Sequence, residues 1–206
     1  MSQDSATAAP LDLRRIIEVL DRHDVEYVLV GGVAARLHGA RRLTMDLDLC
    51  PSWHEENLGR LADALNDLGA TLKGIPASVS LPPVTAAILR TMEVGPWRTP
   101  AGDIDVLQGI PADSHWRLVD FDSLIQRAVE RDLAGCTVYV AALDDIVASK
   151  RISGRPSDVE ALPELETLHN PPGDSSTGVT KPPDPGAVTA YSLPPVQPHS
   201  NEELER

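Results

Sequence analysis

Apolar side chains recur at helical spacing near the start of the chain. Within residues 11–24 they stand at positions i, i+3, i+4 and i+7, which predicts an amphipathic helix. The apolar positions of this helix are Leu13, Ile16, Ile17 and Leu20. The β-branched run VEYVLV at residues 25–30 predicts a strand. Gly31 and Gly32 interrupt that strand, and a second helix is predicted over residues 34–39.

The following residues, up to 169, mix strands with helices. Strands are predicted over residues 44–50, 91–99 and 103–109, with a hairpin over 129–141 that turns near Ala134 and Gly135. Helices are predicted over residues 56–69, 121–128, 142–154 and 156–168, and a Pro-rich crossing over 75–83. Because strict βαβ alternation is absent, we expect an α+β fold, or an α/β fold with a mixed sheet, in which helices flank a central mixed β-sheet.

The composition changes towards the C-terminus. From Asn170 onward the chain is dense in Pro, Gly and Ser and has no helical or alternating periodicity. We therefore expect a disordered N-terminus over residues 1–10, one domain over 11–169 and a disordered Pro-rich tail over 170–206. A solvating linker is the interpretation favoured for this tail, and a PxxP ligand is the alternative.

Charge and cysteine content restrict the class of protein. The 206 residues carry a formal net charge of -13, which argues against a nucleic-acid binder that works by blanket phosphate neutralisation. The two cysteines, Cys50 and Cys136, have no disulfide-framework or zinc-site spacing. The N-terminus lacks a signal-peptide pattern, and no stretch approaches about 18 apolar residues. We expect a soluble cytoplasmic protein without a membrane partner.

Two carboxylates lie inside the predicted strand at residues 44–50. Asp46 and Asp48 share one face of a strand, and the alternation places Met45, Leu47 and Leu49 on the core side. Two like charges side by side call for a cation, and hard oxygen ligands select Mg²⁺, with Mn²⁺ as the alternative. A solvent-facing edge strand with two ordinary aspartates is the other interpretation.

A second short strand, GDIDVL, offers a third carboxylate. Asp105 and Asp103 lie on the same face, and Asp105, between two apolar residues, is the favoured partner of the acid pair. The glycine pair before a helix lets backbone N–H groups approach an anion. Arg36, Arg41 and Arg42 form a basic cluster beside the acid strand. For the scattered tryptophans packing is expected, although Trp97 could line an acceptor cleft.

Three blocks of sequence together resemble one superfamily. The blocks YVLVGGVAARLHGARRLTMDLDL, GDIDVL and LDDIVASKRISGRPSDVEAL occur in this order. They resemble the nucleotidyltransferase superfamily with the polymerase-β type fold, and within it the AbiEii-like and MenT-like toxin nucleotidyltransferases of bacterial toxin-antitoxin pairs. The resemblance implies a nucleotidyltransferase fold with a helical C-terminal segment.

The resemblance also implies roles for ten residues. Asp46, Asp48 and Asp105 would hold Mg²⁺, with Asp105 as the base for the attacking hydroxyl. Lys150 would contact the nucleotide's phosphates as a catalytic cation. The residues implied to bind the nucleotide are Gly31, Gly32, Arg42, Thr44, Lys150, Arg155 and Asp158. Many superfamily members have Gly-Ser in place of the glycine pair, so a side-chain hydroxyl is missing here.

The expected activity is Mg²⁺-dependent transfer of an NMP from an NTP such as ATP to an acceptor hydroxyl. The resemblance implies the tRNA 3′ end as acceptor and a toxin that a cognate antitoxin protein neutralises. One alternative is an enzyme that modifies a small molecule, such as an aminoglycoside, or a protein side chain. Another is a non-catalytic nucleotide-binding or antitoxin-binding module. The acidic composition favours the small molecule, whereas the resemblance favours RNA.

Overall fold

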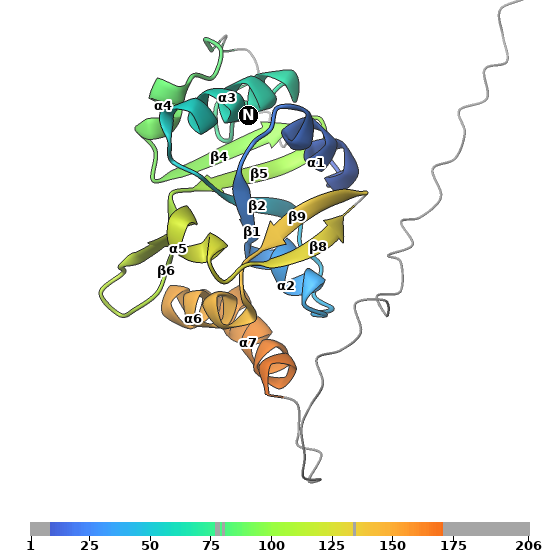
Figure 1. Ribbon diagram of the computed structural model, residues 1–206, viewed down its shortest axis with the longest axis vertical. Helices are drawn as coiled ribbons and strands as arrows, with labels where there is room; N and C mark the ends of the chain where they lie inside the picture. Colours follow the sequence, from blue (N-terminus) through green and yellow to red (C-terminus); the bar gives the residue numbers. More distant parts are fainter. Residues whose placement is uncertain (1–8, 77–78, 80, 134, 171–206) are drawn as a thin grey trace, which may run out of the picture. The chain divides into compact units, whose positions relative to one another are not determined.

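A computed structural model describes residues 9–76, 79, 81–133 and 135–170 of the chain (Figure 1). The segments expected to be disordered, 1–10 and 170–206, lie almost wholly outside these residues. Ala134, one of the two residues at the expected hairpin turn, also lies outside them.

The centre of the fold is a seven-stranded mixed sheet with the strand order β3-β4-β5-β2-β1-β9-β8. Its strands are β1 (Tyr27–Val30), β2 (Asp46–Pro51), β3 (Thr71–Leu72), β4 (Val94–Thr99), β5 (Gly102–Leu107), β8 (Val129–Leu133) and β9 (Cys136–Val140). The pairs β1-β9 and β2-β5 are parallel, and the other four neighbouring pairs are antiparallel. A separate two-stranded sheet pairs β6 (Gly109–Pro111) with β7 (Leu118–Asp120). The predicted mixed sheet is confirmed.

Seven helices are present in the described part of the chain. They are α1 (Leu13–Arg22), α2 (Gly31–Leu37), α3 (Glu55–Asp67), α4 (Ala86–Arg90), α5 (Phe121–Ile125), α6 (Leu143–Ser153) and α7 (Pro156–His169). In Figure 1, α1, α3 and α4 gather towards the top, and α6 and α7 lie at the bottom. None of these helices is long and apolar enough to cross a membrane.

Local chemistry explains where the better-defined helices begin and end. The Asp12 side chain accepts a hydrogen bond from the backbone N–H of Arg15 and so caps α1. Gly154 ends α6 in the left-handed conformation, with a φ of 58°. Pro156 then opens α7, at a position where its missing N–H is not needed.

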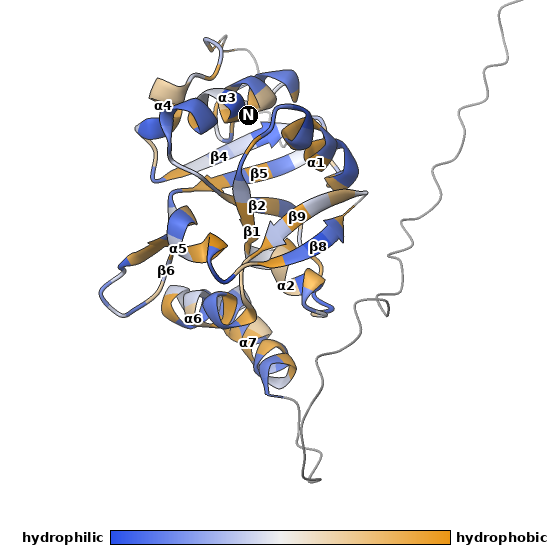
Figure 2. Cartoon of the chain, in the orientation of Figure 1, coloured by the Kyte–Doolittle hydropathy of each residue, from blue (hydrophilic) through white to orange (hydrophobic). Residues whose placement is uncertain are grey.

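Side chains alternate across the two central strands. Leu47 and Leu49 of β2, with Ile104 and Val106 of β5, are at most 1% exposed, and the residues between them face the other side of the sheet. Figure 2 shows a second contrast, between the centre and the edge of the sheet: β1 is coloured mainly hydrophobic and the edge strand β8 mainly hydrophilic. One face of β2 and β5 therefore belongs to the core, and the other carries carboxylates.

The structure corrects several local expectations. Strand β2 begins only at Asp46, so Met45 is 66% exposed and does not face the core. Helix α2 begins at Gly31 rather than at residue 34. Helix α4 and the β6-β7 hairpin were not predicted, because each is too short to show a hydrophobic period. Trp97 is buried and packs in the core, as expected.

Candidate active site

A cavity of about 650 Å³ opens at the carboxylate face of the sheet. All ten residues singled out from the sequence line it. They are Gly31, Gly32, Arg42, Thr44, Asp46, Asp48, Asp105, Lys150, Arg155 and Asp158. Because they come from α2, β2, β5, α6, α7 and the intervening loops, only the folded chain brings them together.

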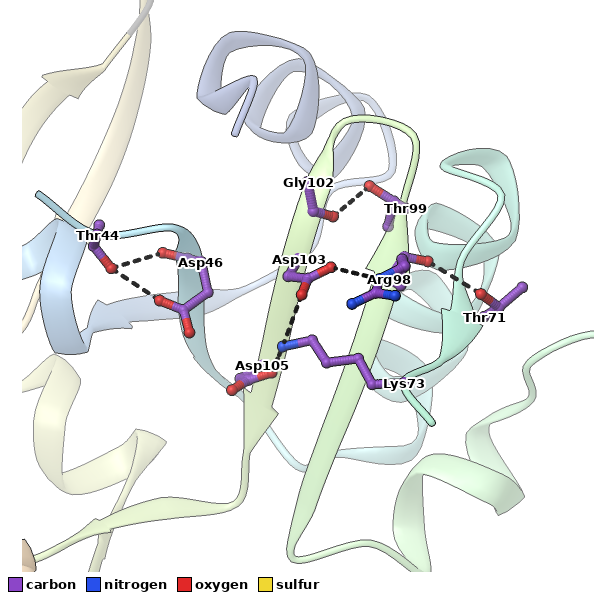
Figure 3. Close-up of polar contacts among 9 residues, drawn as sticks. All are labelled: Thr44, Asp46, Thr71, Lys73, Arg98, Thr99, Gly102, Asp103 and Asp105. Atoms are coloured by element: carbon purple, nitrogen blue, oxygen red, sulfur yellow. Dashed lines mark hydrogen bonds and ion pairs between the residues drawn. The ribbon is translucent and has the colours of Figure 1, made fainter. Parts of the chain in front are cut away.

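The parallel register of β2 and β5 aligns four carboxylates in two pairs. Asp48 lies opposite Asp105, and Asp46 lies opposite Asp103. Only Asp105 of the β5 pair lines the cavity, whereas Asp103 is held by Arg98, whose Nε lies 3.2 Å from its Oδ1 (Figure 3). The geometry therefore selects Asp105, rather than Asp103, as the third acid at the cavity.

Lys73 is a member of this site that sequence reasoning missed. Its backbone N–H donates to the carbonyl of Pro96 in β4, and Pro96 is the cross-strand partner of Asp105. From there its Nζ lies 2.6 Å from Oδ1 of Asp105 and 3.6 Å from Oδ2 of Asp103 (Figure 3). A lone lysine in a loop carries no sequence signal, because only the sheet order places it beside the acids.

The carboxylate environment of Lys73 stabilises its charged form. Burial opposes the charge, but the hydrogen bond to Asp105 and the charges of Asp105, Asp103 and Asp46 outweigh burial and raise the pKa of Lys73. One ammonium group therefore neutralises part of the negative charge of Asp105 and Asp103, the second of which is also paired with Arg98.

Among the acids at the cavity, Asp48 is the one whose charged form is most disfavoured by its surroundings. Burial, followed by the charges of Asp46 and Asp105, raises the pKa of Asp48 to about 7, against the opposing effect of Lys150. The backbone N–H of Gly32 donates to Asp48 Oδ2 at 3.4 Å. Such a partly compensated acid beside two others suits a divalent cation, whose charge would relieve the repulsion.

These acids do not form a ready-made ligand cluster. Among the described residues, no three His, Cys, Asp or Glu side chains are gathered closely enough to hold a metal ion. Thr44 Oγ1 donates to Oδ1 of Asp46 at 2.8 Å, and Lys73 binds Asp105, so two of the acids already have partners. Asp46, Asp48 and Asp105 on adjacent strands are nevertheless hard oxygen donors, the chemical type that Mg²⁺ prefers.

The glycine pair lets the start of α2 lie directly against the acid strand. Gly31 has a φ of 63°, and a Cβ there would collide with the carboxylate of Asp48. A Cβ on Gly32 would lie 2.5 Å from Oγ1 and 2.7 Å from Cβ of Thr44. Any side chain at these two positions would therefore displace a cavity-lining residue.

A buried carboxylate organises the cations on the helical side of the cavity. Asp158, whose side chain is 3% exposed, binds Lys150 Nζ at 2.8 Å through Oδ1 and Arg155 Nε at 2.8 Å through Oδ2. Although burial acts in the opposite direction, the hydrogen bonds and charges of these two cations lower the pKa of Asp158. Asp158 thus fixes both cations at the cavity wall.

Helix α7 also anchors the loop that precedes β2. The backbone N–H of Arg41 donates to Glu164 Oε1 at 2.9 Å, and Arg42 Nη1 lies 2.8 Å from Glu160 Oε2. The loop that contains Thr44 is therefore attached to the same helix that carries Asp158.

No protein-family model matches the chain, and no curated protein matches it. Solved structures do. The solution structure of the antibiotic-resistance factor ANT(2'')-Ia matches with a TM-score of 0.50 and 15% identity, over 76% of this chain and 81% of that one. A provisionally named nucleotidyltransferase from Thermotoga maritima matches with a TM-score of 0.49 and 17% identity, over 75% and 90% of the two chains.

A third match is the lincosamide antibiotic adenylyltransferase LnuA in its lincomycin-bound form. It has a TM-score of 0.45 and 11% identity, over 76% of this chain and 96% of that one. At these identities the likeness concerns the fold. The described part of the chain has a mixed α+β fold similar to that of ANT(2'')-Ia.

Proposed function

We propose that the protein transfers a nucleoside monophosphate from an NTP to an acceptor hydroxyl. The observation that carries this proposal is the alignment of Asp46 and Asp48 with Asp105 on adjacent parallel strands, at the cavity that the glycine-led start of α2 also lines. In such a reaction a bond forms between the acceptor oxygen and the α-phosphorus, the bond to the β-phosphate oxygen breaks, and pyrophosphate leaves.

Each part of the cavity has a role in this proposal. Backbone N–H groups of Gly31 and Gly32 bind the triphosphate, and Lys150 and Arg155 neutralise its charge. Asp105 orients the acceptor hydroxyl and takes its proton on a carboxylate oxygen. Asp46, Asp48 and Asp105 would hold Mg²⁺, which when bound neutralises charge on the phosphates and polarises the reacting phosphorus.

The acceptor and the biological role are finer proposals. The tRNA 3′ end, the toxin role and an antitoxin partner are supported by the sequence resemblance. A small-molecule acceptor is supported by the cavity wall described below, and ANT(2'')-Ia is named an antibiotic-resistance factor. A non-catalytic nucleotide-binding or antitoxin-binding module keeps the cavity but transfers nothing.

The direct test incubates the full chain with Mg²⁺ and each α-labelled NTP in turn, with and without total tRNA. We expect label on an acceptor and release of pyrophosphate, both abolished by chelation of the metal. Asp105→Asn is expected to lower the rate by at least about 100-fold, as is typical when a group that assists proton transfer is lost.

The matched control for that variant is Asp103→Asn. It removes the same charge from the same face of β5, but Asp103 does not line the cavity. We expect its rate to stay within about threefold of the wild type, a change of under 1 kcal/mol. Equal losses in the two variants, or NTP binding without transfer under every condition, would contradict the proposed catalysis.

A further inference from the structure

One wall of the cavity is apolar, exposed and free of cations. Strands β4 to β7 and the turn between β6 and β7 contribute six residues to the cavity lining that we call the apolar wall: Val94, Leu107, Ile110, Pro111, Trp116 and Leu118. Three of them are large and well exposed, with Trp116 at 60%, Val94 at 52% and Leu118 at 42%. A group of exposed apolar side chains at a cavity often marks a binding surface.

The wall lies directly beside the acid proposed to receive the acceptor's proton. Leu107 is two residues beyond Asp105 in β5 and therefore shares its face, and Val94 is the cross-strand partner of Leu107. A molecule whose hydroxyl reaches Asp105 would thus have the apolar wall beside it.

The turn that presents Trp116 is held in a strained conformation by polar contacts. Trp116 has a φ of 57°, unfavourable for a residue with a large side chain. The Asp113 carbonyl accepts from the N–H of Trp116 at 2.9 Å, while its carboxylate accepts from the N–H groups of His115 at 2.9 Å and Arg117 at 3.3 Å. The turn therefore holds the Trp116 indole at the cavity at some conformational cost, which indicates that the indole has a role in binding.

The cavity lining offers phosphates no positive charge on this side, although the exposed side chains of His115 and Arg117 flank Trp116 outside the lining. The cavity-lining residues between 93 and 118 include two acids, Glu93 and Asp105, and no Lys, Arg or His. The lining cations, Arg42, Lys150 and Arg155, belong to other segments, and the proposed triphosphate would engage Lys150 and Arg155. An RNA end would bring several phosphates, whose binding depends on such cations.

We propose that the apolar wall is the acceptor subsite, and that it takes a small hydroxyl-bearing molecule with an apolar ring and no negative charge. The ring stacks on Trp116 and packs against Val94 and Leu118, which directs the hydroxyl to Asp105. This inference rests on the proposed nucleotidyl transfer and assigns its acceptor class.

Binding can be tested without any transfer, by following the indole N–H signals of the three tryptophans in NMR spectra. The Trp116 signal is identified by its loss in Trp116→Phe. The probes are phenyl β-D-glucoside, methyl β-D-glucoside and total tRNA. We expect phenyl β-D-glucoside to shift the Trp116 signal and methyl β-D-glucoside, which has the same hydroxyls without the aromatic ring, to leave it unchanged.

Leu118→Lys and Val159→Lys make a matched pair of variants. Val159 of α7 is also exposed and apolar, at 56%, but does not line the cavity. We expect Leu118→Lys to weaken binding of phenyl β-D-glucoside about tenfold, through loss of one packing contact and desolvation of the new charge. Val159→Lys is expected to leave it unchanged.

Three results would overturn the assignment. They are equal responses of Trp116 to the two glucosides, no response to either, and a response to tRNA in place of phenyl β-D-glucoside. Failure of the proposed nucleotidyl transfer can be told apart from failure of the acceptor assignment. In that case no NTP would yield transfer, but the Trp116 signal would still shift with phenyl β-D-glucoside.

Discussion

At the scale of single residues, the Thr44 side chain fills the space that a side chain at position 32 would need. A serine at position 32, as many nucleotidyltransferases have, would bring its Cβ within 2.7 Å of the Thr44 side chain. The hydroxyl that the glycine lacks is supplied nearby by Thr44, which donates to Asp46. We infer that these two positions are coupled, so that a hydroxyl is accommodated from one side or the other.

A double-mutant cycle tests this coupling. We expect Gly32→Ser alone to lower transfer and the melting temperature, because of overpacking that typically costs about 1–3 kcal/mol. Thr44→Gly alone loses the hydrogen bond to Asp46, and the double variant should recover much of both losses, because Thr44→Gly removes both atoms, Oγ1 and Cβ, that a side chain at position 32 would meet. Additive effects on activity and melting temperature would show that the two side chains do not share this space functionally.

Lys73 gives a second expectation at this scale. Without Mg²⁺, Lys73→Met should lower the melting temperature by about 2–6 °C, because Asp105 and Asp103 lose a shared counter-ion and repel one another. Mg²⁺ should narrow that difference, since the ion supplies the missing positive charge. Thermal melts with and without Mg²⁺ measure it.

The control for Lys73→Met is Arg22→Met, which breaks an exposed pair with Asp67 far along the chain from the acids. Its small effect on stability should be the same with and without Mg²⁺. A Lys73→Met deficit that Mg²⁺ leaves unchanged would mean that the lysine acts only by packing.

Asp48 illustrates a conflict between stability and activity. Asp48→Asn should abolish transfer and, without metal, raise the melting temperature, because burial and the charges of Asp46 and Asp105 disfavour the Asp48 carboxylate. Asp63→Asn on the exposed side of α3 should change neither quantity. Loss of stability in Asp48→Asn would show that the carboxylate is better compensated than its surroundings indicate.

At the scale of elements, helices α6 and α7 depend on the ion pairs of Asp158. Asp158→Asn should lower the free energy of unfolding by about 3 kcal/mol, because Lys150, whose side chain is only 17% exposed, loses its charged partner. The folded-state pKa of Asp158 lies below its unfolded value, so its stabilisation is complete above about pH 4 and is lost as the pH falls further.

Urea unfolding of the wild type and Asp158→Asn across the acid range measures this dependence. The difference in free energy between the two proteins should shrink as the pH falls below about 4. Arg151→Met, which breaks the exposed pair with Glu166, is the comparison for an ordinary ion pair of α6 and α7 and should cost under about 1 kcal/mol. A difference independent of pH would exclude the Asp158 charge as its cause.

The elements also show which parts of the fold sequence patterns reveal. The long periodic helices and the alternating strands β2 and β5 were predicted to within a few residues, because burial on one face dictates their periodicity. The β6-β7 hairpin has strands of three residues, too short to show alternation. Because the β6-β7 hairpin was not predicted, the position of Trp116 was not predicted either. Trp116 was expected to pack and instead lines the cavity.

At the scale of the whole molecule, the ten candidate residues line one cavity, although Lys150, Arg155 and Asp158 were expected there from the sequence resemblance and not from spacing alone. Their roles remain predictions. Lys73 escaped because its position beside Asp105 depends on the order β3-β4-β5, a tertiary property that no local pattern encodes. Met45 was misassigned for a related reason, since the loop anchored to α7 delays the start of β2.

The carboxylates of α7 hold two parts of the cavity wall: Asp158 binds Lys150 and Arg155, and Glu160 and Glu164 bind the loop at Arg41 and Arg42. A product of early termination before Pro156 would therefore keep every described strand and every candidate metal ligand, yet Lys150 would lose its acidic partner Asp158 and the loop at Arg41 and Arg42 would lose its contacts with α7. We expect such a shortened protein to show no nucleotidyl transfer. Under the proposed mechanism, α7 is thus as necessary as the strands that bear the acids.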